Sequence, residues 1–103
     1  MNPNDVAEIR HRLHGVGMRS TIARIRLLYI LEHSNAPMSI RDLSEQVEPT
    51  VNDRYAIARV LRDLEGFGFC LRIEDVDGVR YTASRRQARL VEDTNVSVSS
   101  DIG

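Results

Sequence analysis

The sequence predicts a mainly α-helical domain that ends in a small β-hairpin, and three observations lead to this prediction. Apolar residues recur at helical spacing in four segments of the first two thirds of the chain. Beyond Gly66 and Gly68 the period changes from 3.6 to 2. With 103 residues, the chain is long enough for one hydrophobic core and too short for two.

The first two helices are marked by capping residues and by glycines. Asn4 is the predicted N-cap of a short first helix, which Gly15 and Gly17 end. Thr21 or Ser20 is the predicted N-cap of the second helix, in the stretch "STIARIRLLYILEHS". The expected buried positions are Val6, Ile9 and Leu13 in the first helix, and Ile22, Ile25, Leu28 and Leu31 or Tyr29 in the second.

A break at "SNAP" separates the second helix from a short third helix, because a helix does not continue through Pro37. Ser39 and Asp42 form a capping-box-like S-x-x-D at the start of this third helix, and Pro49 ends it. Its inward residues are predicted to be Ile40, Leu43 and Val47.

The fourth helix is expected over residues 53–65, with Asn52 or Asp53 as its N-cap, and it has two different faces. One face shows the i, i+3, i+4, i+7 pattern of a stripe packed on a core: Ile57, Val60, Leu61 and Leu64. The opposite face carries three large polar side chains, flanked by alanines: Tyr55, Arg59 and Arg62. Such a face is suited to approach a partner.

Residues 70–82 are predicted to form a two-stranded hairpin with a tight turn at Asp77-Gly78. Two sets of residues alternate on its first strand: Phe69, Leu71 and Ile73 against Cys70, Arg72 and Glu74. Two sets alternate on its return strand: Val79 and Tyr81 against Arg80 and Thr82. A lone hairpin is marginally stable in water, so its apolar face should lie on the helices. Phe69, Leu71 and Ile73 are therefore expected to point inward, and Cys70 outward.

This order of elements is that of a winged helix-turn-helix domain, which we expect over residues 1–83. Residues 84–103 form a C-terminal extension, for which the sequence predicts a weak helix in "SRRQARLVED" and then a polar, disordered tail. In this fold, the helix at 53–65 would be the recognition helix in the DNA major groove. The hairpin at 70–82 would be the wing that touches the neighbouring backbone.

The net charge of −1 hides an asymmetry along the chain. Three of the 15 acidic residues lie within residues 92–103, so residues 1–91 hold 14 basic and 12 acidic side chains. Every one of the 14 basic residues is arginine. Two explanations are open: a GC-rich genome would favour arginine codons, or the planar guanidinium is used because it suits phosphates and guanine edges better than an ammonium group does. The single cysteine excludes an internal disulfide, and no signal peptide or long apolar run is present, so a cytoplasmic protein is expected.

The stretch "GMRSTIARIRLLYILE" resembles the opening of the DNA-binding domain of the ferric uptake regulator (Fur) family. The similarity continues through "MSIRDLSEQV", "IARVLRDLEGFGF" and "DGVRY", and covers about residues 6–83. The resemblance implies that Arg19 matches the family's basic residue that reaches the minor groove. It also implies that Arg59 matches the arginine of the family's recognition helix.

The chain departs from the Fur pattern in three places. Ala58 stands where the family usually has a tyrosine, and Tyr55 lies one turn earlier on the same broad face. The family's histidine in the loop before the third helix is missing from "NAPM". The family's C-terminal metal-binding and dimerisation domain should begin near residue 85, where this sequence is nearly finished. We therefore expect no metal: neither a cysteine pair nor a histidine-rich run exists, and His11 and His14 alone make no closed site.

The resulting hypothesis is a DNA-binding transcriptional regulator without metal sensing, cofactor or membrane association. Neither a glycine-rich phosphate loop nor a nucleophile with an identifiable base is present, so no enzyme activity is expected. The expected partners are double-stranded DNA and a second copy in a weak homodimer, joined through the first helix, the outer hairpin edge or residues 84–92. The candidate DNA-binding residues are Arg19, Arg24, Tyr55, Arg59, Arg62, Arg72 and Arg80.

An alternative hypothesis is a winged-helix adaptor or inhibitor that binds a protein through the same face. In that case Arg59 would pair with Asp63 one turn later, and the polar face of the fourth helix would be an ion-paired surface. Cys70 also has two interpretations, as a thiol sensor or as a cysteine with no redox role.

Overall fold

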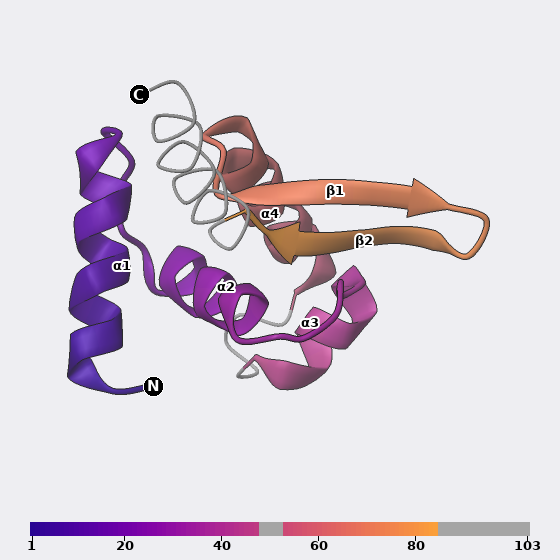
Figure 1. The fold of residues 1–103 in the computed structure, drawn as a ribbon, viewed down its shortest axis with the longest axis horizontal. Coiled ribbons are helices and arrows are strands. Elements are labelled where there is room, and N and C mark those ends of the chain that lie inside the picture. Colours follow the sequence, from indigo (N-terminus) through magenta and orange to yellow (C-terminus); the bar gives the residue numbers. More distant parts are fainter. Residues whose placement is uncertain (48–52, 85–103) are drawn as a thin grey trace, which may run out of the picture.

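In the described part of the chain, four helices precede one antiparallel hairpin, which confirms the predicted winged helix-turn-helix fold (Figure 1). The computed structural model of the chain describes residues 1–47 and 53–84. The predictions for Pro49, for Asn52 and for the segment from residue 85 onward lie outside these described residues. The elements are α1 (Pro3–Gly15), α2 (Ile22–Glu32), α3 (Ile40–Gln46), α4 (Arg54–Gly66), β1 (Cys70–Asp75) and β2 (Gly78–Ala83).

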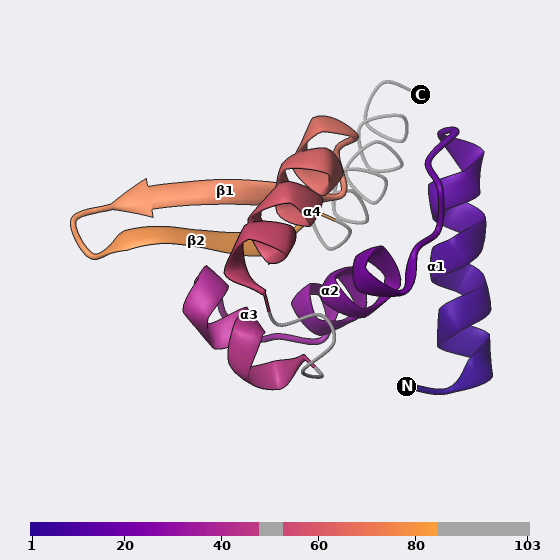
Figure 2. The same cartoon turned by 180° about the vertical axis from the view of Figure 1, so that it is seen from behind.

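The helices pack around one core, and α2 lies at its centre in contact with α1, α3, α4 and β2. In both views α1 stands at the end of the molecule opposite the hairpin tip (Figures 1 and 2), and α4 packs against both α3 and β1. The core is formed by Ile9, Leu13, Met18, Ile25, Leu27, Leu28, Leu31, Met38, Leu43, Val47, Ile57, Leu61, Leu64, Cys70 and Tyr81.

The central place of α2 corrects one prediction about its buried face. Ile22 was expected in the core but is 69% exposed, because it is the first residue of the helix and precedes the packed turns. Leu27, which was not predicted, is fully buried. A helix with neighbours on several sides buries more than a single stripe, so its pattern of apolar residues is a weaker guide to its orientation.

Side-chain caps start all four helices, and three of them lie where the sequence predicts. Thr21 accepts from the backbone N–H of Arg24, and Asp53 accepts from that of Tyr55. Ser39 and Asp42 form a full capping box, in which each side chain accepts from the backbone N–H of the other residue. The Ser39 N–H and hydroxyl hold the pKa of Asp42 below its ordinary value.

The cap predicted for α1 was wrong. Asn2, not Asn4, caps this helix, and its Oδ1 accepts from the Asp5 N–H at 2.9 Å. Pro3 takes the first helical position, where its fixed φ is already helical and its missing N–H costs no intrahelical hydrogen bond.

The hairpin packs through a face of β1 opposite to the predicted one. Cys70 pairs with Ala83 and Arg72 pairs with Tyr81, so these residues share the inner face. Cys70 is buried, whereas Leu71 and Ile73 are 40% and 37% exposed on the outer face. Tyr81 decides the orientation, since it is buried on β2 and its backbone N–H and C=O both bond to Met38 ahead of α3. Because side chains alternate along a strand, fixing one residue fixes every other.

The turn of the hairpin is shifted by one residue from the predicted Asp77-Gly78. Its two loop residues are Val76 and Asp77, and the Asp77 N–H donates to the Asp75 carboxylate at 2.8 Å. Gly78 begins the return strand with a φ of 124°, a conformation that a residue with a Cβ rarely adopts.

Candidate nucleic-acid interface

The outer face of α4 carries the three polar residues that the sequence predicts there. Tyr55 is 82% exposed, and Arg59 and Arg62 are also exposed. On the opposite side of the same helix, Ile57, Leu61 and Leu64 are buried. Within the described part of the chain, the guanidinium groups of Arg59 and Arg62 form no ion pair and no hydrogen bond. Their charges are therefore open to a partner.

Two acidic residues in or next to α4, Asp53 and Asp63, already have other partners. Asp53 uses its carboxylate to cap the helix. Asp63, expected as a partner of Arg59 in the adaptor hypothesis, instead forms an ion pair with Arg24 of α2 at 3.1 Å.

Arg24 has a second contact that connects it to Arg19. Its Nη1 donates to the backbone C=O of Arg19 at 2.7 Å, while its Nη2 binds Asp63. The same carbonyl also accepts from the Thr21 N–H at 3.2 Å. The side chain of Arg19 is exposed and has no partner among the residues that the structure describes. Arg24 thus joins the segment that carries Arg19 to α4, through an ion pair with Asp63, which lies 39 positions later in the sequence.

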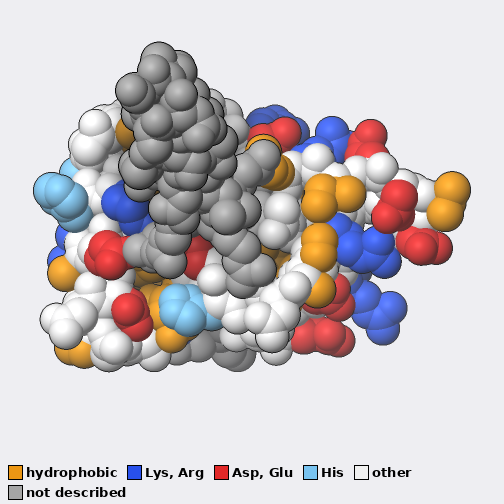
Figure 3. Space-filling model, viewed as in Figure 1, with side chains coloured by type: hydrophobic (Ala, Val, Ile, Leu, Met, Phe, Trp, Pro, Cys, Tyr) orange, Lys and Arg blue, Asp and Glu red, His pale blue; other side chains and the backbone are white. Residues whose placement is uncertain are grey.

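The two predicted arginines of the wing are both ion-paired. Arg72 pairs with Glu74 on the same strand, and Arg80 pairs with Asp75 across the hairpin at 3.3 Å. Basic and acidic side chains are therefore intermixed along the hairpin (Figure 3). Exposed pairs of this kind are weakly held, with a typical contribution of about 0–1 kcal/mol, so another anion can replace the carboxylate.

Sequence reasoning missed one exposed arginine at this surface. Arg54 is the first residue of α4, directly after its cap. The signal was available, because the first turn of a recognition helix is the part that commonly reaches base edges.

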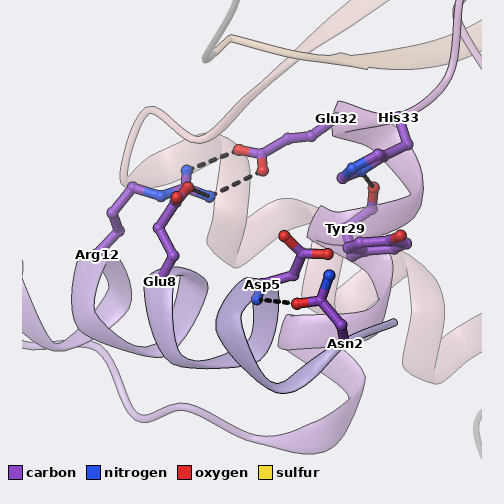
Figure 4. A network of polar contacts seen from close by, with 7 residues as sticks. All are labelled: Asn2, Asp5, Glu8, Arg12, Tyr29, Glu32 and His33. Carbon is purple, nitrogen blue, oxygen red and sulfur yellow. Dashed lines mark hydrogen bonds and ion pairs between the residues drawn. The ribbon is translucent and has the colours of Figure 1, made fainter.

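The far end of the molecule holds a separate polar network that fastens α1 to α2 (Figure 4). Arg12 of α1 bonds to Glu32 of α2 through both terminal nitrogens, and Glu8 lies 3.6 Å from the same guanidinium. At the end of α2, His33 stacks on Tyr29 with ring centroids 3.9 Å apart. This network stabilises helix packing and lies on α1 and α2, away from the exposed face of α4.

No group of three or more histidine, cysteine or acidic side chains within residues 1–47 and 53–84 could hold a metal ion. His14, one of the two histidines considered above, lies 2.9 Å from the Ser20 hydroxyl instead.

Cys70 is not on the outward register that was predicted for it. Its thiol is buried, and its Sγ lies 3.7 Å from the backbone oxygen of Leu61, to which it donates. Burial, and then the charge of Glu65, raises the pKa of this thiol to about 12. The thiolate is the reactive form of cysteine, so this side chain is unsuited to thiol sensing.

Across the helices that the structure describes, none has the length and apolar character needed to cross a bilayer.

No protein-family model matches the sequence, and no curated protein is significantly similar to it. Similarity appears instead at the level of structure.

Solved structures of regulatory proteins share this fold, among them the following three. The ferric uptake regulator Fur of Helicobacter pylori matches with a TM-score of 0.65 and 18% identity, over 79% of this chain and 56% of its own. The Fur protein of Vibrio cholerae matches with a TM-score of 0.60 and 18% identity, over 73% and 60%. An ArsR-like transcriptional regulator from Rhodococcus sp. RHA1 matches with a TM-score of 0.54 and 20% identity, over 96% and 87%. The chain therefore spans little more than half the length of the two Fur proteins, and it has the winged-helix fold of transcriptional regulators.

Proposed function

We propose that this protein is a DNA-binding transcriptional regulator, that it is not an enzyme, and that α4 is its recognition helix. The observation that carries the proposal is the exposed face of α4, where Arg59 and Arg62 have no partner among the described residues. Three structural neighbours, two Fur proteins and an ArsR-like regulator, are transcriptional regulators, which supports the proposal.

The dimensions of α4 suit the major groove. The groove of B-DNA is about 12 Å wide, and an α-helix with its side chains is about 10–12 Å across. Tyr55 and Arg62 are seven residues apart, which corresponds to roughly 10 Å along the helix axis. Between them, the small side chain of Ala58 does not obstruct the close approach of a partner. Arg59 and Arg62 can therefore reach guanine edges or phosphates, and Tyr55 can contact a base or the sugar-phosphate backbone.

The other candidates have supporting positions around α4. Arg19 would contact the duplex from the segment before α2, as its match to the Fur residue implies. Arg72 and Arg80 would contact phosphates from the wing, after exchange of their carboxylate partners for phosphate oxygens. We propose that the domain is Fur-like in its DNA-binding part and works without the metal sensing of that family.

Binding to duplex DNA at several salt concentrations tests the function. The probe is a pool of duplexes of random sequence, roughly 20 base pairs long, which offers two helical turns. We expect the logarithm of the affinity to fall linearly with the logarithm of the salt concentration, because phosphate contacts release counterions. Absence of salt-dependent binding at low salt would contradict the proposal and favour the protein-binding adaptor.

A further inference from the structure

Arg24 lies at the junction between two elements that carry arginines for the proposed interface. Its Nη1 donates to the Arg19 carbonyl at 2.7 Å, and its Nη2 lies 3.1 Å from the Asp63 carboxylate of α4. Its side chain is only 21% exposed. One planar group thus joins the segment before α2 to the middle of the candidate recognition helix.

We propose that Arg24 is a positioning residue, which holds Arg19 in register with α4 so that both meet the duplex as one surface. This inference rests on the proposed DNA binding, and it replaces the direct DNA contact that the sequence suggested for Arg24. Both terminal nitrogens of the guanidinium already have partners inside the protein, and the side chain is only 21% exposed, so little of this group is open to a phosphate.

Fixing Arg19 before binding raises affinity without adding a contact. The segment between α1 and α2 carries Gly17 with a φ of 78° and has no regular secondary structure of its own. Ordering such a segment during association costs conformational entropy, and a segment already held by the Arg24 contact avoids that cost.

The same ion pair also keeps Arg59 available. Asp63 follows Arg59 by four residues on α4, a spacing at which opposite charges attract. Because Arg24 holds the Asp63 carboxylate, the Arg59 guanidinium stays unpaired among the described residues. Without Arg24, Asp63 would be free to pair with Arg59, and the Arg59 guanidinium would then be less available to DNA.

Lysine cannot replace arginine in this role, because an ammonium group has no planar fork that reaches two separate acceptors. Arg24→Lys therefore keeps the positive charge but removes the two-acceptor contact that positions Arg19. We expect Arg24→Ala and Arg24→Lys each to weaken duplex binding about tenfold, the effect of losing charge-assisted contacts that order the interface. Arg10→Ala, which removes the same charge from an exposed site on α1, is the matched control and should change affinity less than about twofold. Wild-type affinity in Arg24→Lys would overturn the proposal.

A double-mutant cycle shows whether Arg24 acts through Arg19. If it does, Arg24→Ala should cost clearly less in an Arg19→Ala background than in the wild type, because the side chain that Arg24 positions is gone. The effects of two independent DNA contacts on the affinity would instead multiply, and that result would contradict the proposal.

Asp63→Asn removes the other partner of the same ion pair, and it replaces the Arg24 variants in the test if those do not fold. It should weaken binding although it removes a negative charge, and tighter binding would overturn the idea.

Amide hydrogen exchange in the free protein separates this inference from the proposed function. The Thr21 N–H donates to the same Arg19 carbonyl as Arg24 does. We expect it to exchange about fivefold faster or more in Arg24→Ala, while amides of α3 keep their rates. If the wild type binds no duplex, the proposed function fails. If duplex binding is present but Thr21 exchange is unchanged in the variant, only the positioning role fails.

Discussion

Arg12 donates hydrogen bonds to the Glu32 carboxylate from both terminal nitrogens of its guanidinium, at 2.6 and 2.8 Å, and thereby connects α1 to the end of α2. The Glu32 side chain is only 4% exposed, and that of Arg12 is 24% exposed. Removing one partner leaves the other charge in a largely dry site, which destabilises the fold more than the pair itself stabilises it.

We therefore expect Arg12→Ala to lower the free energy of unfolding by about 2–3 kcal/mol, below the usual range for fully buried pairs because Arg12 keeps some water contact. Urea unfolding measures this loss. In the double variant Arg12→Met/Glu32→Leu, where no charge remains, much of the stability should return. A single variant as stable as the wild type would mean that the contact contributes nothing.

Arg59→Ala and Arg62→Ala should each weaken duplex binding with little change in melting temperature. Both side chains lie on the exposed face of α4, where truncation opens no cavity. Loss of a bidentate base contact would cost about 1–3 kcal/mol of binding free energy, whereas loss of a phosphate contact would lower the salt slope by about 1.

Leu61→Ala is the matched control on the same helix. Leu61 is fully buried, and its truncation should cost about 2–5 kcal/mol of stability. If either arginine variant melted as early as this one, the assignment of the exposed face would be wrong.

The buried thiol of Cys70 makes stability depend on alkaline pH. Its folded pKa of about 12 lies above the ordinary value of 9.0. The unfolded thiol therefore loses its proton first, so the contribution of the neutral thiol is complete below pH 9 and is lost as the pH rises toward 12. Burial raises the pKa of Tyr81 as well, which acts in the same direction.

Urea midpoints at about pH 8 and about pH 10.5 measure this dependence, with Cys70→Ala as the control that lacks the thiol. The decrease between the two pH values should be smaller in Cys70→Ala than in the wild type. A thiol-specific disulfide reagent should leave the native protein unmodified at neutral pH and label it once unfolded. Rapid labelling of the native protein would be incompatible with the buried position of Cys70.

Self-association is expected to be weak and to strengthen on DNA. A single winged helix makes few phosphate contacts, and binding of two copies to adjacent half-sites raises affinity through effective concentration. Sedimentation at several protein concentrations, with and without duplex, should show a monomer or weak dimer that becomes a two-to-one complex. A strict monomer that binds one-to-one with nanomolar affinity would contradict this prediction.

Local rules in the sequence predicted the helices well, and contacts between distant residues account for the errors. The capping box of Ser39 and Asp42 depends on residues three apart, so it could be predicted directly. The inner face of β1 depends on how Tyr81 packs against Met38, which no pattern within β1 reveals. An alternating strand with apolar residues on one face therefore gave the wrong orientation for Leu71 and Ile73.

In the candidate site, too, the features set by local sequence were predicted and those set by contacts between distant residues were not. The exposed stripe of Tyr55, Arg59 and Arg62 follows from helical periodicity alone and was found. The partner of Asp63 could not be found, because two residues on α4 and α2 meet only after the whole domain has folded. Sequence reasoning paired Asp63 with Arg59, one turn earlier on the same helix, whereas the structure pairs it with Arg24 of α2.

The backbone bridge between Met38 and Tyr81 has a consequence for the order of folding. It joins the chain ahead of α3 to the return strand of the wing, and the whole of α3, α4 and β1 lies between these two residues along the chain. Closing so long a loop is unfavourable until other contacts bring its ends together, and a two-stranded hairpin alone is marginally stable. We therefore expect the wing to be completed late in folding, with kinetic φ-values near zero at β2 and larger ones in α2 and α4.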